Sequence, residues 1–186
     1  MPRLAVAAFD GDGLQLFHAL SGQLRILDAQ LTNLGIPNPD AEDDNWSQLL
    51  DIFARTLLHP EMHCSFGVTF SKDGHLAAVA LNKMNAEIRA VAPESVSAAT
   101  WARSHYNASV LCLSSNYTGA SAASDILEAF FLTPFGTRAR DHYLTNLLST
   151  IRPLPAESLS QSPPVPFPKI HHRREEDVPN NEAGIG

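Results

Sequence analysis

The sequence predicts a three-layer αβα sandwich around a doubly wound, parallel sheet of about five strands. Short apolar, β-rich runs alternate with helical segments from residue 3 to residue 151. The central stretch 64–93 reads as strand, turn, helix and strand, and such a βαβ unit pairs its strands in parallel. The chain has 186 residues and 44% hydrophobic content, enough for one domain with a buried core.

The first half of the chain supplies two strands and two helices. Residues 3–9 are an apolar strand that ends at the Asp-Gly-Asp-Gly turn over 10–13. A helix is predicted over 14–24 and a second strand over 25–31, followed by a loop rich in Pro and Asp. A second helix is predicted over 46–58, because its apolar residues recur at helical spacing: Leu49, Leu50, Phe53 and Leu57.

The second half continues the alternation. A strand over 66–70 and the turn Ser71–Gly74 precede a helix over 75–83, and strands follow at 88–92 and 109–113. Further helices are predicted over 94–105, where Pro93 provides the start, and over 120–132 and 136–151. The domain therefore covers 1–152. Residues 153–186 are rich in proline and polar residues, and we predict a tail that does not fold alone.

Composition excludes several classes of protein. The net charge of -7 argues against a nucleic-acid partner, and no apolar run reaches the length of a membrane span. Two cysteines, Cys64 and Cys112, do not make a disulfide framework and fit a reducing, cytoplasmic compartment. We predict no cofactor and no metal.

Three motifs, in this order and spacing, resemble the type B ribose-5-phosphate isomerase family, which includes the galactose-6-phosphate isomerase subunits. They are N-K-x-x-x-x-I-R-A at 82–90, R-S-H-Y-N at 103–107 and T-P-F at 133–135. The resemblance covers about residues 3–151 and implies the same αβα fold. It also implies dimers with active sites between subunits, and interconversion of aldose and ketose phosphates through an enediolate.

The resemblance carries over only some of the family's functional residues. Asp10 matches the family Asp, but Gly11 stands where a His follows it. Ser71 falls where one subgroup has a catalytic Cys, and Ala77 falls where another has a Glu base. His105 matches the family His. Of the family's arginines, Arg140 matches one, Asn116 and Leu144 replace two others, and Arg138 offers partial compensation.

We predict the site at the loops that follow the strands, where ligands bind in parallel sheets. The predicted catalytic residues are Asp10, Ser71, Asp73 and His105. The predicted substrate-binding residues are Trp46, Lys72, Gly74, Tyr106, Asn107, Asn116, Arg138 and Arg140. Ordinary roles are the alternatives: a helix cap for Asp10, a turn for Asp73 and a dipole-stabilised helix end for His105.

The lost arginines and the carboxylate of Asp73 disfavour a phosphate dianion. We therefore predict a divergent, dimeric enzyme that moves protons on a small carbonyl compound by isomerisation, cyclisation or dehydration, with natural-product biosynthesis as one setting. One alternative is a sugar-phosphate isomerase whose anion site uses Lys72, Arg138, Arg140 and His142; another is a non-catalytic subunit or binding protein. Asp10→Asn and His105→Ala should abolish turnover and leave the melting temperature nearly unchanged.

Overall fold

The structure is a computed structural model that describes residues 3–26, 30–33, 46–136, 146–147 and 150. The chain divides into two units, Met1–Ile151 and Arg152–Gly186. The second unit lies wholly outside the described residues, so the tail over 153–186 stays a prediction. In the part of the chain that is described, no helix is long and apolar enough to cross a membrane.

A five-stranded sheet in the order β2-β1-β3-β5-β4 forms the middle layer, and every neighbouring pair is parallel. This confirms the predicted fold class. The strands are β1 (Arg3–Ala8), β2 (Gln30–Asn33), β3 (Cys64–Ser71), β4 (Ala90–Val91) and β5 (Val110–Ser114).

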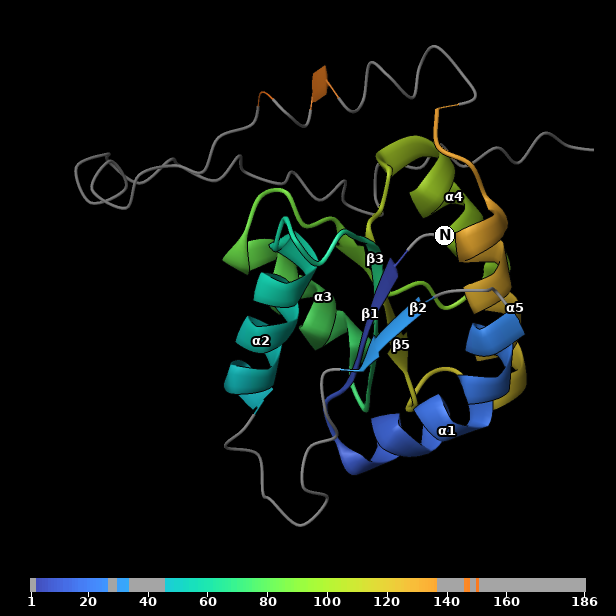
Figure 1. The fold of residues 1–186 in the computed structure, drawn as a ribbon. Coiled ribbons are helices and arrows are strands. Elements are labelled where there is room, and N and C mark those ends of the chain that lie inside the picture. The colour runs from blue at the N-terminus through green and yellow to red at the C-terminus, as the bar shows by residue number, and fades with distance from the viewer. Residues whose placement is uncertain (1–2, 27–29, 34–45, 137–145, 148–149, 151–186) are drawn as a thin grey trace, which may run out of the picture. The chain divides into compact units, whose positions relative to one another are not determined.

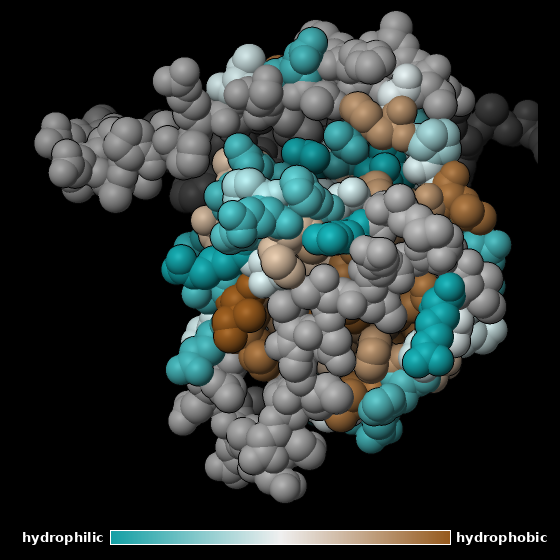
Figure 2. Space-filling view, viewed as in Figure 1, coloured by the Kyte–Doolittle hydropathy of each residue, from teal (hydrophilic) through white to brown (hydrophobic). Residues whose placement is uncertain are grey.

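Helices cover both faces of the sheet (Figure 1). One face carries α1 (Gly11–Ile26), α4 (Val96–Tyr106) and α5 (Ala120–Leu132), and the other carries α2 (Trp46–Leu58) and α3 (Gly74–Met84). Alternate residues of the strands fill the two cores, as the period of two in a strand requires. Figure 2 shows apolar side chains at the surface over α2, the helix in which Ile52 is 46% exposed.

Several element boundaries differ from the sequence prediction. The strand predicted over 25–31 starts too early, because α1 runs on to Ile26 along a buried stripe of Leu16, Leu20 and Leu24. The strand predicted over 88–92 contains only Ala90–Val91. α4 begins after Ser95, whose hydroxyl accepts a hydrogen bond from the N–H of Ala98 at 3.2 Å, and not directly after Pro93.

The helix predicted over 136–151 lies mostly outside the described residues. Gly136 is not helical and has a φ of 79°, whereas residues 146, 147 and 150 are helical. The prediction is therefore wrong at its first residue and stays a prediction for the stretch that is not described.

Two glycines hold helix N-termini against the ends of neighbouring strands. A Cβ on Gly13 would lie 2.3 Å from the carbonyl oxygen of Phe70, so the start of α1 packs directly on the end of β3. A Cβ on Gly74 would lie 2.9 Å from the carbonyl oxygen of Cys112, so the start of α3 packs on β5. Both contacts gather helix N-termini at the carboxyl edge of the sheet.

Candidate active site

The order of the strands creates a switch point at the carboxyl ends of β1 and β3. β1 lies between β2 and β3, and the helices that leave β1 and β3 cover opposite faces of the sheet. In sheets of this kind ligands bind in the crevice between two such diverging connections. Here the turn over 10–13 and Ser71–Gly74 lie together at this edge, joined through Asp10 and Lys72.

Asp10 ties the two connections together. Its Oδ1 accepts a hydrogen bond from the N–H of Gly13 at 2.7 Å, and its Oδ2 accepts one from the N–H of Lys72 at 2.7 Å. The first bond caps α1 and the second fixes the start of the β3–α3 turn. Asp10 is thus both the helix cap that sequence reasoning offered as its ordinary role and a link across the predicted site.

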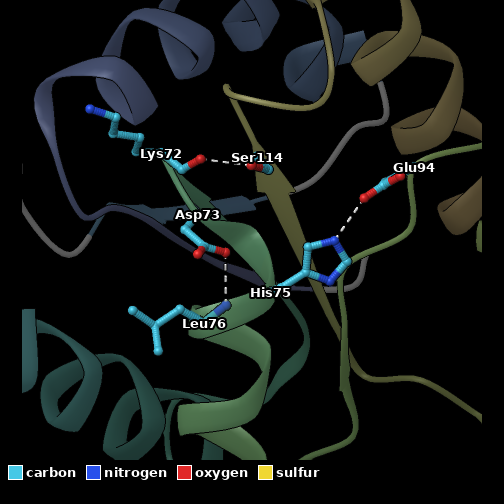
Figure 3. A network of polar contacts seen from close by, with 6 residues as sticks. All are labelled: Lys72, Asp73, His75, Leu76, Glu94 and Ser114. Carbon is cyan, nitrogen blue, oxygen red and sulfur yellow. Dashed lines mark hydrogen bonds and ion pairs between the residues drawn. The ribbon is translucent and has the colours of Figure 1, made fainter.

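The turn Ser71–Gly74 is fixed from several sides (Figure 3). Asp73 caps α3, because its Oδ1 accepts a hydrogen bond from the N–H of Leu76 at 3.0 Å. From the β5 side, the hydroxyl of Ser114 donates to the carbonyl oxygen of Lys72 at 2.7 Å. The side chain of Lys72 is exposed at this edge, and Gly74 is buried under the start of α3. The turn is therefore a rigid platform that carries a positive charge toward solvent.

Ser71 ends β3 inside the protein. Its side chain is fully buried, and among the described residues its hydroxyl has no hydrogen-bond partner. A serine becomes a nucleophile or base only when a neighbouring group activates it. The described residues supply no such group to Ser71, so its predicted catalytic role stays a prediction.

A histidine that sequence reasoning missed lies at the same edge. The Nε2 of His75 lies 2.8 Å from the Oε1 of Glu94, and its ring packs edge-on against Tyr117 at 5.7 Å between centroids. These residues follow β3, β4 and β5. A signal was available, because parallel strands bring the residues that follow them to one edge.

His105 lies at the opposite end of the sheet. α4 leads into the first residue of β5, so its last turn sits at the amino edge, whereas Asp10 follows the end of β1. The His105 ring stacks on Trp101 at 3.8 Å between centroids, and its Nδ1 lies 2.6 Å from the hydroxyl of Ser104. It lines a cleft of about 440 Å³ with Thr133 and Pro134. One chain therefore does not bring His105 to Asp10, and the predicted acid/base pair is not formed within it.

Tyr106 and Asn107, which follow His105, make hydrogen bonds at the end of α4. Asn107 adopts a left-handed conformation with a φ of 49° and ends α4. Its side-chain oxygen accepts a hydrogen bond from Arg103 at 3.1 Å, and its carbonyl accepts one from Arg89 at 2.7 Å. The Tyr106 hydroxyl accepts a hydrogen bond from the indole N–H of Trp101 at 3.3 Å.

The remaining predicted residues divide between core, cleft and undescribed parts of the chain. Trp46 packs edge-on against Phe9, the residue that precedes Asp10, at 5.3 Å between ring centroids. Asn116 lines a cleft of about 460 Å³ between the starts of α1 and α5. Arg138 and Arg140 lie outside the described residues.

Among the described residues, two buried groups have shifted pKa values because burial disfavours the charged form of each. Burial raises the pKa of Cys112 to about 12, with a smaller opposing effect of Thr69, so its thiol stays protonated and unreactive. Burial, and then the charge of Arg89, lower the pKa of Arg103. The Arg103 guanidinium lies over the Phe66 ring at 4.7 Å and donates to the carbonyl oxygen of Ala108 at 2.6 Å.

Comparisons with known proteins agree on one family. A sequence model described as Ribose/Galactose Isomerase matches residues 5–146. Ribose-5-phosphate isomerase B of Mycolicibacterium paratuberculosis is 27% identical over 157 residues, which are 84% of this chain and 93% of that protein. The solved structure of ribose 5-phosphate isomerase B from Anaplasma phagocytophilum matches with a TM-score of 0.67 and 26% identity, covering 80% of this chain and 97% of that one. The Mycoplasma genitalium enzyme, solved with bound ribulose-5-phosphate, shares the fold with a TM-score of 0.67 and 24% identity over 79% of this chain and 94% of its own.

Proposed function

We propose, since this chain belongs to the ribose/galactose isomerase family, that it interconverts an aldose phosphate and the corresponding ketose phosphate. This is the alternative that sequence reasoning ranked second, and the comparisons favour it over chemistry on an unphosphorylated compound. The observation that carries the proposal is the bridge made by Asp10 between Gly13 and Lys72, which ties the two connections together at the switch point of the sheet.

The proposed substrate lies across the turn Ser71–Gly74, with its carbonyl end toward the start of α3. A helix N-terminus carries a partial positive charge, and this favours the enediolate oxygen that forms during isomerisation. Lys72 offers a charge to the phosphate at the same edge. From the sequence, Arg138 and Arg140 are proposed to complete the phosphate site.

A second copy of the chain enters the proposal through His105. Because this residue lies at the amino edge of its own sheet, it reaches a crevice at the carboxyl edge only from a neighbouring subunit. We therefore propose a dimer, as the family resemblance implies. The measurement for this step is the molar mass in solution by light scattering; a monomer with full activity would contradict it.

One observation favours a second candidate, a substrate without a phosphate. The carboxylate of Asp73 occupies the N-terminus of α3, where an anion would otherwise accept hydrogen bonds from free N–H groups. This candidate keeps the same proton chemistry on a small carbonyl compound with less charge.

The test is a panel of ribose 5-phosphate, ribulose 5-phosphate and galactose 6-phosphate beside unphosphorylated ribose and galactose. Interconversion is followed by NMR from the anomeric and ketose signals. Turnover of a phosphorylated sugar supports the main proposal, and turnover of only the unphosphorylated sugars supports the second. No turnover of any sugar contradicts the main proposal and leaves a carbonyl compound that is not a sugar, or the non-catalytic alternative.

Asp73→Asn separates the two candidates further. Asparagine caps helices as well as aspartate, so the fold and the start of α3 should persist. Removing one negative charge near a phosphate is worth about 1 kcal/mol per unit charge at 4 Å even in water, which lowers KM about fivefold. An unchanged KM for a phosphorylated substrate would show that its phosphate does not lie near Asp73.

A further inference from the structure

We propose that His75, oriented by Glu94, is the base that moves the proton in this site. The inference rests on the proposed isomerase function and assigns its proton transfer to a residue that the family motifs do not indicate. Glu94 is a positioning residue in this assignment, because it acts on the substrate only through His75.

The geometry defines which ring nitrogen of His75 can accept a proton from the substrate. Nε2 lies 2.8 Å from Oε1 of Glu94, and an ionised carboxylate only accepts hydrogen bonds. In the neutral ring the proton is therefore on Nε2, and the lone pair is on Nδ1. Such a carboxylate–histidine pair fixes the tautomer and stabilises the imidazolium that forms when Nδ1 takes up a proton.

The other predicted proton carriers of this edge are engaged or lack activation. Both oxygens of Asp10 accept backbone hydrogen bonds, and Asp73 caps α3. Ser71 is buried without an activating base among the described residues. Within the same chain, His105 lies at the other edge of the sheet, with its ring stacked on Trp101.

The location of His75 suits a reacting sugar. It is in the first turn of α3, directly after the turn Ser71–Gly74, and Figure 3 shows its ring pointing away from Asp73 and toward Glu94. The side chain of His75 is 52% exposed, so a substrate bound at the carboxyl edge of the sheet can reach it. Tyr117, which is 58% exposed, forms an aromatic wall beside the ring.

The step balances without a cofactor. Nδ1 of His75 takes the proton from the carbon next to the substrate carbonyl, and the C–H electron pair forms the enediolate. The imidazolium then returns the proton to the former carbonyl carbon, and proton exchange between the two oxygens leaves the isomeric ketose or aldose.

The experiment compares His75→Gln with His18→Gln in the full-length protein. His18 is an exposed histidine of α1, so its variant is a matched control for loss of a surface imidazole. A general base contributes about 100-fold to 10,000-fold, so His75→Gln should lower kcat by at least about 100-fold with little change in KM. The His18→Gln variant should keep the wild-type rate, and circular dichroism should show that both variants are folded.

A second pair tests the positioning role. Glu94→Gln removes the charge that fixes the tautomer, so it should lower kcat, by less than His75→Gln does, with little change in KM, and Glu94→Asp should recover part of the lost kcat. Glu87→Gln, at an exposed carboxylate of the α3–β4 connection, should leave kcat and KM unchanged. An unchanged kcat in Glu94→Gln would overturn the positioning role.

The outcomes separate this inference from the function on which it rests. If the wild-type protein isomerises a sugar phosphate and His75→Gln keeps its kcat within about threefold, the pair is an exposed ion pair only and the inference fails while the function stands. If the wild-type protein isomerises none of the sugars in the panel, the proposed function fails and this inference fails with it.

Discussion

Replacing Asp10 by asparagine tests whether its carboxylate holds the site together. The wild-type side chain accepts two hydrogen bonds at 2.7 Å, from Gly13 at the start of α1 and from Lys72 after β3. An asparagine offers one oxygen, and its NH₂ group would face the second N–H donor. One of the two links is therefore lost whichever way the amide turns.

The magnitude follows from what is lost. A hydrogen bond to a charged group contributes about 1.5 to 3 kcal/mol, and a carboxylate at a helix N-terminus adds about 0.3 to 1 kcal/mol. Asp10→Asn should therefore lower the free energy of unfolding by about 2 to 4 kcal/mol. For a domain of this size each kcal/mol corresponds to about 2 to 4 °C, so the melting temperature should fall by about 4 to 16 °C.

The assay is urea unfolding followed by circular dichroism, with thermal melts in parallel. Asp12→Asn is the matched control, because Asp12 is an exposed carboxylate in the first turn of the same helix. Its loss should cost about 0.3 to 1 kcal/mol. Equal stability of the two variants would show that the bridge to Lys72 contributes nothing, and the expectation of a nearly unchanged melting temperature would hold after all.

Five further variants test the packing at the carboxyl edge of the sheet and in the core beneath it. Gly13→Ala places a Cβ 2.3 Å from the Phe70 carbonyl oxygen and should cost about 1 to 3 kcal/mol in urea unfolding, whereas Gly11→Ala, with nothing within 4 Å, should be neutral or stabilising. Ser71→Ala removes a buried hydroxyl that has no partner among the described residues and should not destabilise, whereas Ser114→Ala loses its bond to the Lys72 carbonyl and should cost about 1 kcal/mol. Because the Cys112 pKa is raised from 9.0 to about 12, the folded state holds a proton that the unfolded state loses above pH 9. Its stabilisation is complete below pH 9 and is lost as pH rises toward 12, by about 1.4 kcal/mol per unit, so Cys112→Ala should flatten the alkaline fall in unfolding free energy.

The fold class could be predicted because each layer leaves its own periodicity in the sequence. Residues 4–9 alternate between the two cores, and α1 repeats a leucine every fourth position from Leu16 to Leu24. The boundary of β2 could not be placed, because Arg25 and Ile26 suit a strand as well as the last turn of a helix. Packing of Leu24 in the core decides for the helix, and local preference does not contain that information.

The structure brings some of the predicted site residues together and separates others, and the site itself stays a prediction. Strand ends can be located in a sequence, so Asp10 and the turn Ser71–Gly74 were found and lie together. His75 was missed because its partner Glu94 is 19 residues away and is placed by β4, the shortest strand. His105 was assigned to the same side because a motif gives a residue's identity without telling which end of the sheet its helix reaches.

The charge argument against a sugar phosphate weakens once the carboxylates have partners. From the sequence alone, Asp73 adds to the turn Ser71–Gly74 a negative charge that would repel a phosphate. In the structure this carboxylate accepts a hydrogen bond from the start of α3, whose partial positive charge offsets part of it. The neighbouring Lys72 is exposed, so charges at this edge interact in a dielectric closer to that of water. In water, two unit charges 4 Å apart interact by about 1 kcal/mol. A repulsion of that size raises KM and leaves the proton chemistry intact, and this reconciles the acidic loop with an isomerase family whose substrates are anions.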